Sequence, residues 1–395
     1  MSGRPRCVPV VMYHSVRERR SQTWEYRHLT LEMPFFERQL QYFRRHGYSV
    51  VRLEDVVAFK RGDIDLPRRS VCLTFDDGYL DNWVYAFPLL AKHGYPSTLF
   101  VATDFVDPRP MLRPRRGDGR RDGELDEAYE VDGFMSWEEL REVEAGGLVD
   151  VQSHTVTHTF LPASEDIVEF HHPGDDRPWP SWNARPDGKP FYMSDAAAGD
   201  SPCLGGPVYS VQPALATREV IERGGLTDHL IALVQSRGGS SFFGAPDWLD
   251  ELIEATARYL NAHTVTYERE AEESYERRVR AELVDSKAKI ETELGKTVRY
   301  LCWPNDGCDD VTHEMALEAG YEATTAKGSP NAHASADPTR IQRTGLHQVG
   351  SRRVVSSAFV HYALNAHAEV WPYAQVRRAL AQTRILGHVK AVAYR

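Results

Sequence analysis

Val71-Cys72-Leu73-Thr74-Phe75-Asp76-Asp77-Gly78 is the stretch that decides the fold. Its apolar, β-branched and aromatic residues stop abruptly at the two aspartates, which predicts a buried parallel strand that runs into a loop. Parallel strands of an α/β sheet or barrel place their polar residues at the carboxyl ends, where ligands bind and chemistry occurs. We therefore predict an α/β fold with a functional site beside Asp76 and Asp77.

Asp76 and Asp77 are consecutive, and consecutive side chains on a strand point to opposite faces. Both carboxylates can serve one centre only if the chain turns there, and Gly78 permits such a turn. One carboxylate would then bind a cation while the other stays free as a base. The alternative is that Asp-Asp-Gly forms only a turn or a helix cap.

A second motif, Ser153-His154-Thr155-Val156-Thr157-His158, places two imidazoles four residues apart. On a helix or a helical turn, this spacing puts both on the same face. With one carboxylate they form a two-histidine, one-aspartate set, which leaves coordination positions open as a catalytic zinc site requires. Alone, the pair could be surface or hydrogen-bonded histidines; together, the two motifs predict a divalent-metal hydrolase.

These motifs resemble those of the polysaccharide deacetylase family, also called the NodB-homology or carbohydrate esterase family 4 enzymes. Gly94-Tyr95-Pro96-Ser97-Thr98-Leu99-Phe100-Val101 is similar to the family's second strand. Val10-Val11-Met12-Tyr13-His14-Ser15-Val16 resembles the subgroup that deacetylates β-1,6-linked N-acetylglucosamine polymers, in which the barrel is circularly permuted. The resemblance covers residues 8–160 and about 275–346.

The resemblance implies a distorted (β/α)7-type barrel with a long insertion. Residues 1–161 would form the first part of the barrel with the catalytic motifs, and residues 266–350 the remainder. Residues 162–265 would be the insertion, which could cap the barrel rim, and residues 351–395 a C-terminal helical segment. Between residues 162 and 213 the density of Pro, Gly, Asp and Trp indicates irregular structure.

The resemblance also implies roles for individual residues. Asp77, His154 and His158 would hold a divalent metal, with zinc the first expectation and cobalt or nickel the alternatives. Asp76 would take the proton of the attacking water, and His14 would protonate the departing amine as general acid. Without the family order of motifs, His14 would be interpreted as a buried, hydrogen-bonded histidine at a strand end.

The family's third motif is altered in this chain. The family usually has an arginine two residues before a proline, whereas this sequence has Cys302 there. A backbone N–H of the loop Trp303-Pro304-Asn305 would help to stabilise the oxyanion. Arg340 or Arg343 could supply the missing cation and orient the base.

The predicted activity is metal-dependent removal of N-acetyl groups from an amino sugar or polysaccharide of the N-acetylglucosamine type, with release of acetate. Another carbon–nitrogen hydrolase on the same scaffold, which cleaves a formyl, imide or other amide group, is one alternative. A catalytically weak carbohydrate-binding protein is another, because the 302–307 loop is altered. Trp179 and Trp182 in the insertion suit either stacking on sugar rings or packing of a loop.

Composition sets wider limits on this interpretation. A chain of 395 residues exceeds the usual single domain, and a formal charge of −10 argues against a nucleic-acid binder. The five cysteines show no paired-ligand spacing, which predicts free thiols in a reducing compartment. Neither a secretory signal nor a run of ~20 apolar residues is found, so we expect a cytoplasmic protein without a transmembrane segment. The sequence does not indicate an oligomeric state.

Overall fold

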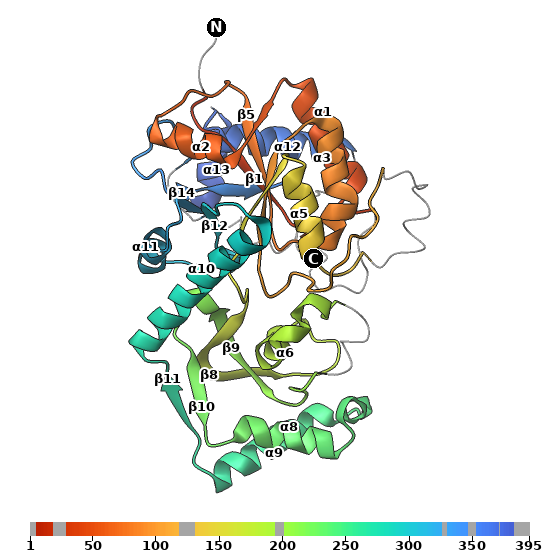
Figure 1. The fold of residues 1–395 in the computed structure, drawn as a ribbon. Helices are drawn as coiled ribbons and strands as arrows, with labels where there is room; N and C mark the ends of the chain where they lie inside the picture. The colour runs from red at the N-terminus through yellow and green to blue at the C-terminus, as the bar shows by residue number, and fades with distance from the viewer. Residues whose placement is uncertain are drawn as a thin grey trace.

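The computed structural model describes residues 5–18, 29–117, 131–193, 201–325, 330–346, 353–370 and 372–382. Parts of the expected first, second, third and C-terminal segments lie outside these ranges. A barrel of parallel strands forms one end of the molecule, and the insertion forms an elongated second part beside it (Figure 1). The long helix α10 (Glu272–Leu294) connects the insertion back to the barrel.

The central sheet runs in the order β14-β13-β12-β7-β6-β5-β1-β15, and every neighbouring pair in it is parallel. Its strands are β1 (Val10–Tyr13), β5 (Ser70–Phe75), β6 (Ser97–Val101), β7 (Val149–Ser153), β12 (Tyr300–Cys302), β13 (Ala323–Thr325), β14 (Arg340–Ile341) and β15 (Arg343–Gly345). β4 (Ser49–Val51) pairs with β5 off this path, and β2 (Ser15–Arg17) pairs with β3 (Thr30–Glu32).

The two terminal strands of this path close the sheet on itself. β14 pairs with β13 and β15 pairs with β1, and Gln342 alone separates β14 from β15. β14 and β15, the two ends of the path, are therefore one kinked segment, and the eight strands form a nearly closed barrel. When the kinked segment is counted once, seven strand positions remain, which confirms the predicted distorted (β/α) barrel.

Helices flank the barrel because each presents one apolar stripe to it. In α1, for example, Phe36, Leu40 and Phe43 recur at helical spacing and are fully buried. The flanking helices are α1 (Met33–Arg45), α2 (Leu53–Arg61), α3 (Phe87–His93), α5 (Trp137–Ala145), α10 and α11 (Asp310–Glu318), and a C-terminal pair follows, α12 (Arg353–His367) and α13 (Tyr373–Gln382).

The insertion is a folded element with its own apolar core. It contains the antiparallel pairs β8 (Phe160–Phe170) with β9 (Pro207–Pro213) and β10 (Val220–Arg223) with β11 (Thr266–Arg269), and the helices α6 (Trp179–Ala184), α8 (Leu226–Ser236) and α9 (Trp248–Ala262). Leu226, Leu230 and Val234 of α8 pack against Leu252 of α9 and are fully buried. The expectation of irregular structure from 162 to 213 is wrong for the pair β8–β9. The density of Pro and Gly does not reveal pairing between strands that lie far apart in the chain.

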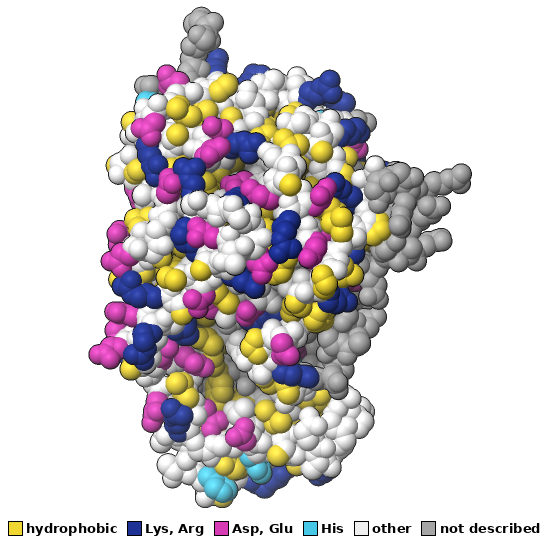
Figure 2. Space-filling model, viewed as in Figure 1, with side chains coloured by type: hydrophobic (Ala, Val, Ile, Leu, Met, Phe, Trp, Pro, Cys, Tyr) yellow, Lys and Arg dark blue, Asp and Glu magenta, His cyan; other side chains and the backbone are white. Residues whose placement is uncertain are grey.

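The surface charge and the cysteines are ordinary for a globular protein. Lys and Arg side chains are interspersed with Asp and Glu over the face shown in Figure 2. Within the described ranges, no helix combines the length and the apolar composition needed to cross a membrane. All five cysteines are free thiols, as the sequence predicts.

Candidate active site

The acidic motif forms a tight turn at the carboxyl end of β5. Asp77 (φ 73°) and Gly78 (φ 78°) both adopt the left-handed conformation, so the chain turns before the strand alternation can separate the two carboxylates. Asp76 and Asp77 therefore line the same pocket. A Cβ atom at Gly78 would lie 3.1 Å from Val101 Cγ1, so close packing as well as backbone conformation favours glycine there.

The histidine motif is a loop after β7 and not a helical turn, so the predicted reason for its geometry is wrong. Thr155 (φ 69°) and His158 (φ 41°) both have left-handed backbone conformations. The chain turns at these two residues, and the rings of His154 and His158 both lie beside the Asp77 carboxylate. A left-handed β-branched residue such as Thr155 is strained. Five of the seven described non-glycine residues with positive φ belong to this site, namely Asp77, Thr155, His158, Asn305 and Asp306.

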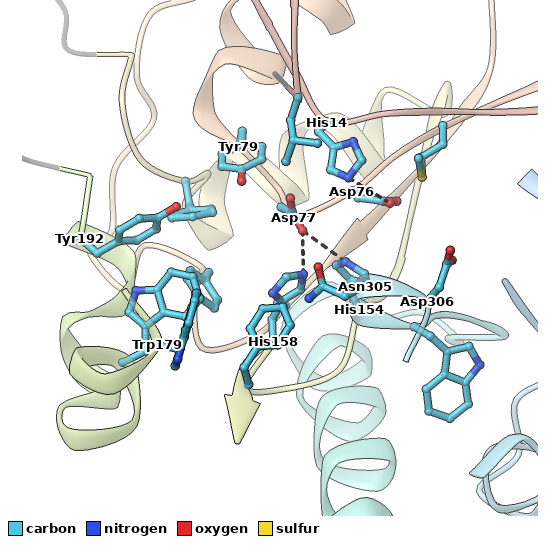
Figure 3. Close-up of a pocket in the computed structure, with 18 of the residues that line it drawn as sticks. His14, Asp76, Asp77, Tyr79, His154, His158, Trp179, Tyr192, Asn305 and Asp306 are labelled. Atoms are coloured by element: carbon cyan, nitrogen blue, oxygen red, sulfur yellow. Dashed lines mark ion pairs between the residues drawn. The ribbon is translucent and has the colours of Figure 1, made fainter. Parts of the chain in front are cut away.

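Asp77, His154 and His158 converge on one point (Figure 3). The Nε2 atoms of His154 and of His158 each lie 3.2 Å from Asp77 Oδ1. His154 Nδ1 lies 2.8 Å from the carbonyl oxygen of Cys302, which can only accept a hydrogen bond. The Nδ1 atom of His154 therefore carries a proton, which leaves Nε2 as the ring nitrogen that a metal can use.

This arrangement fits a divalent cation. Asp77 Oδ1 is buried and makes no aligned hydrogen bond to any described residue, although buried polar atoms normally have a partner. The three ligand atoms lie within 4.8 Å of one another. Burial by itself raises the pKa of Asp77, but the two histidines outweigh burial and hold that pKa well below its usual range. An ionised carboxylate with two imidazoles is a donor set that zinc accepts.

Asp76 is held by Arg343. Arg343 Nη1 lies 2.6 Å from Asp76 Oδ1 and Nη2 lies 2.9 Å from Oδ2, a bidentate pair whose side chains are 8% and 3% exposed. Burial raises the pKa of Asp76, and the adjacent guanidinium outweighs burial and brings that pKa below its ordinary value. Asp76 is thus ionised and fixed in orientation.

The altered third motif and the position of this arginine are connected. Arg343 Nη2 also lies 2.9 Å from Cys302 Sγ, so the small side chain at 302 leaves room for a guanidinium that comes from β15. Arg340 instead pairs with Asp310 at 2.8 Å and Asp337 at 3.5 Å. Of the two candidate arginines, Arg343 and not Arg340 contacts Asp76.

His14 directly follows β1 and also lies near Asp76. Its Nε2 atom is 3.7 Å from Asp76 Oδ2, and its ring lines the pocket. Burial lowers the pKa of His14, so the resting ring is neutral. Its side chain is 16% exposed and therefore reachable from the pocket.

The pocket encloses about 520 Å³ and has two unlike sides. Asn305 and Asp306 lie on one side of the metal ligands, and Trp179 and Tyr192 of the insertion lie on the other (Figure 3). Trp303 also lines the pocket, whereas Pro304 does not and has no N–H to donate. The oxyanion donor of this loop can therefore come only from the N–H of residue 303 or 305.

Several pocket residues were not found by sequence reasoning. Tyr79, Phe105 and Phe134 of the barrel loops and Tyr192 of the insertion form an aromatic wall. Phe105 is its centre, with ring centroids 5.0 Å from Phe134 and 5.1 Å from Trp182. Tyr79 follows the acidic motif directly, and no motif marks Phe105, Phe134 or Tyr192 in the sequence.

The sequence model of one protein family, described as polysaccharide deacetylase, matches residues 63–171 and 232–324. The matched segments contain Asp76, Asp77, His154 and His158 and leave out His14 and Arg343. The second segment begins inside the insertion, earlier than the resemblance about 275–346 implied.

Relatives with assigned names match a shorter part of the chain. The chain is 28% identical over 145 residues to the poly-beta-1,6-N-acetyl-D-glucosamine N-deacetylase of Escherichia coli strain K12, which is 37% of this chain and 20% of that protein. It is 25% identical over 154 residues to the enzyme of the same name from Staphylococcus aureus strain MSSA476, covering 36% of this chain and 46% of that protein. The chain thus matches less than half the length of these relatives.

Solved structures share the fold over most of the chain. A de-N-acetylase from Aggregatibacter actinomycetemcomitans aligns with a TM-score of 0.53 at 18% identity, covering 89% of this chain and 99% of that one. The BpsB deacetylase domain from Bordetella bronchiseptica aligns with a TM-score of 0.51 at 19% identity, covering 86% and 96%. Because the family's sequence model accounts for just over half of its residues, this chain belongs to the polysaccharide deacetylase family.

Proposed function

We propose that this protein is a metal-dependent hydrolase that removes acetyl groups from the amine of an N-acetylated amino sugar. The observation that carries the proposal is the convergence of Asp77, His154 and His158 beside a second carboxylate, Asp76, that has its own arginine partner. Family membership supports the reaction type, and the names of the relatives support N-acetylglucosamine polymers as the substrate class.

Asp77, His154 and His158 would hold the metal, for which zinc suits the donor set and cobalt or nickel are alternatives. When bound, such a metal supplies a Lewis acid that polarises an amide carbonyl and lowers the pKa of a water molecule.

Asp76 would act as the general base that takes the proton of the attacking water. Its ionised state and its bidentate contact with Arg343 suit this role, because the carboxylate is fixed and unprotonated before substrate binds. The backbone N–H of residue 303 or 305 would donate to the developing oxyanion.

His14 would protonate the nitrogen of the leaving amine. His14 Nε2 lies 3.7 Å from Asp76 Oδ2, so the proton taken by Asp76 would reach the neutral imidazole through one bridging water or after the two groups move closer on substrate binding. The proton removed from water would thus reach the nitrogen, so that one amide and one water give one amine and one acetic acid, which ionises to acetate and a proton.

His14→Gln should keep full metal content and lower kcat on N-acetylglucosamine oligomers by about 100- to 1,000-fold, because an alkylamine leaves only when it is protonated. An aryl acetate ester needs no such proton, so its hydrolysis should change little in the same variant. Steady-state kinetics on both substrates check this expectation. An equal loss on both substrates would remove His14 from the role of acid.

Trp179 and Trp182 of the insertion differ in burial, and we assign packing to Trp182 and stacking on a sugar ring to Trp179. Trp182 is buried, with its ring 5.1 Å from Phe105 and 5.0 Å from Tyr192, so it packs the wall. Trp179 is half-buried and lines the pocket, which suits stacking on a sugar ring.

Trp179→Ala should raise KM for N-acetylglucosamine oligomers by roughly 2- to 10-fold, the loss of one aromatic contact, and leave kcat almost unchanged. Trp179→Tyr, which keeps an aromatic face, should restore most of the affinity. The measurement is kcat and KM on both variants. A fall in kcat at constant KM would place Trp179 in the chemical step and not in substrate binding.

Acetate release and metal content, measured together on the purified protein, test the proposed function. Stoichiometric metal with acetate release from N-acetylglucosamine oligomers supports it. Metal with release of formate or ammonia from other amides, and none of acetate, would favour a different carbon–nitrogen hydrolase. Glycan binding without turnover of any amide in metal-loaded protein would favour a carbohydrate-binding protein.

A further inference from the structure

The loop that joins the two histidine ligands cannot hold its shape by itself. Thr155 and His158 both have positive φ, a conformation that persists only where surrounding groups determine it. The loop backbone is accordingly bound at nearly every position. Thr103 N donates to Thr155 O and Asp104 N donates to Val156 O, both at 3.1 Å, which ties the first half of the loop to the end of β6.

The helix α10 holds the amide groups of the second half. Glu282 accepts hydrogen bonds from Val156 N at 2.8 Å, from Thr157 N at 3.0 Å and from the hydroxyl of Thr157 at 2.5 Å. Glu282 is 7% exposed, so these bonds form away from bulk water. One carboxylate thus fixes two consecutive N–H groups immediately before His158.

The insertion holds the carbonyl group of Thr157. Lys189 belongs to a short 3-10 helix of the insertion, η3 (Pro186–Phe191), and is 1% exposed. Its Nζ atom donates to Thr157 O at 2.9 Å and to Asp104 Oδ2 at 2.9 Å, and it lies 5.6 Å from the centre of the Phe105 ring. A buried ammonium group is costly unless it is paired. Of the two groups that accept from Lys189, one belongs to the loop that carries His158 and the other to the segment that is hydrogen-bonded to that loop.

Thr157 is therefore held from opposite directions, its N–H by α10 and its C=O by the insertion. The insertion begins directly after His158 and returns to the barrel through α10. Thr159 is anchored in the same way, because its carbonyl accepts from Ala214 N at 3.0 Å and its hydroxyl lies 2.7 Å from Asn183 Oδ1.

We propose that Lys189 and Glu282 are positioning residues that set the His158 imidazole for metal, and that docking of the insertion and metal binding are thermodynamically coupled through them. The proposal rests on the proposed function only in requiring that Asp77, His154 and His158 bind a metal. Coupling of two equilibria is reciprocal, so metal must also stabilise the contact of residues 186–191 with the barrel.

Co²⁺ titration of the full chain, followed by its visible absorption, tests the first half. Lys189→Met keeps the length of the side chain and removes its charge, and we expect it to weaken Co²⁺ binding by about 10- to 100-fold, as for other partners of ligand residues. Glu282→Gln should weaken binding in the same direction, because both N–H groups donate to one carboxylate oxygen, Oε2, and a neutral amide oxygen accepts hydrogen bonds more weakly than a carboxylate. The absorption spectrum should change in both variants as the His158 contact loosens.

Lys289→Met is the matched control, because Lys289 lies on α10 with its side chain 51% exposed and pairs with Glu293 at 2.8 Å. It should bind Co²⁺ as the wild type does. Wild-type affinity and spectrum in both Lys189→Met and Glu282→Gln would overturn the inference. If the wild type itself binds no Co²⁺, the metal triad fails, which is a different result.

Hydrogen exchange of the wild-type protein tests the second half without any substitution. Addition of Co²⁺ should slow exchange of the amides in 155–158 and in 186–191 together. In Lys189→Met the slowing should be confined to 155–158. Protection of 155–158 alone in the wild type would show that the insertion is not coupled to the metal site.

Discussion

Asp77→Ala is expected to abolish stoichiometric metal binding and to lower acetate release by more than about a thousandfold. Asp77 is the one carboxylate of the ligand set, and its removal leaves two neutral imidazoles to hold a divalent cation. Loss of a Lewis acid costs several kcal/mol of transition-state stabilisation, and about 4 kcal/mol corresponds to a thousandfold. Elemental analysis of the purified variant and an acetate assay on the same sample provide the measurement.

Asp150→Ala is a suitable control for this variant. Asp150 is a carboxylate on β7, the strand that leads to His154, but it lines a different cavity and pairs with Lys296. It should retain metal and activity. Wild-type metal content in Asp77→Ala would show that Asp77 is not a ligand and would leave the pocket without its proposed centre.

Asp76→Asn is expected to retain metal and to lose turnover by about 100- to 10,000-fold, the usual contribution of a general base. Asparagine has nearly the same shape and accepts one hydrogen bond from Arg343, but its amide cannot take a proton from water. Metal content, kcat and KM should be measured together, because the expected result is a fall in kcat with little change in metal or KM.

Arg343→Lys separates charge from orientation at the same carboxylate. Lysine keeps the positive charge and loses the bidentate geometry, so we expect a smaller loss of kcat than in Asp76→Asn. Asp76→Asn with wild-type kcat would exclude Asp76 as the base. Loss of metal in Asp76→Asn would instead show that both aspartates serve the metal.

The site could be predicted from sequence where its chemistry is local. Asp76 and Asp77 follow an apolar run that is completely buried as β5, and the pattern of a strand ending at polar residues needs no tertiary information. His154 and His158 could be assigned to the same metal site as Asp77 because only a few residue types, chiefly His, Cys, Asp and Glu, bind metals in proteins. The reason for their convergence could not be predicted, because left-handed residues such as Thr155 leave no mark in an amino-acid pattern.

The rest of the site depends on contacts between distant parts of the chain. Arg340 and Arg343 were indistinguishable in sequence, and only the register of β15 against β1 aims Arg343 at Asp76. The aromatic wall was missed because Phe105, Phe134 and Tyr192 have the composition of ordinary core residues. Lys189 was missed because a buried lysine looks like any surface lysine until its burial is known.

The kinked segment β14–β15, which closes the barrel, is synthesised late, and the proposed active site cannot form before it. Asp76 and its partner Arg343 are 267 residues apart, and Arg343 lies on β15, the last of the described strands in chain order. At about 5–20 residues per second, the ribosome needs on the order of tens of seconds to make the chain between them. During that time Asp76 is already synthesised but lacks the cation that orients it, so the proposed catalysis must wait until the chain has been made through Arg343.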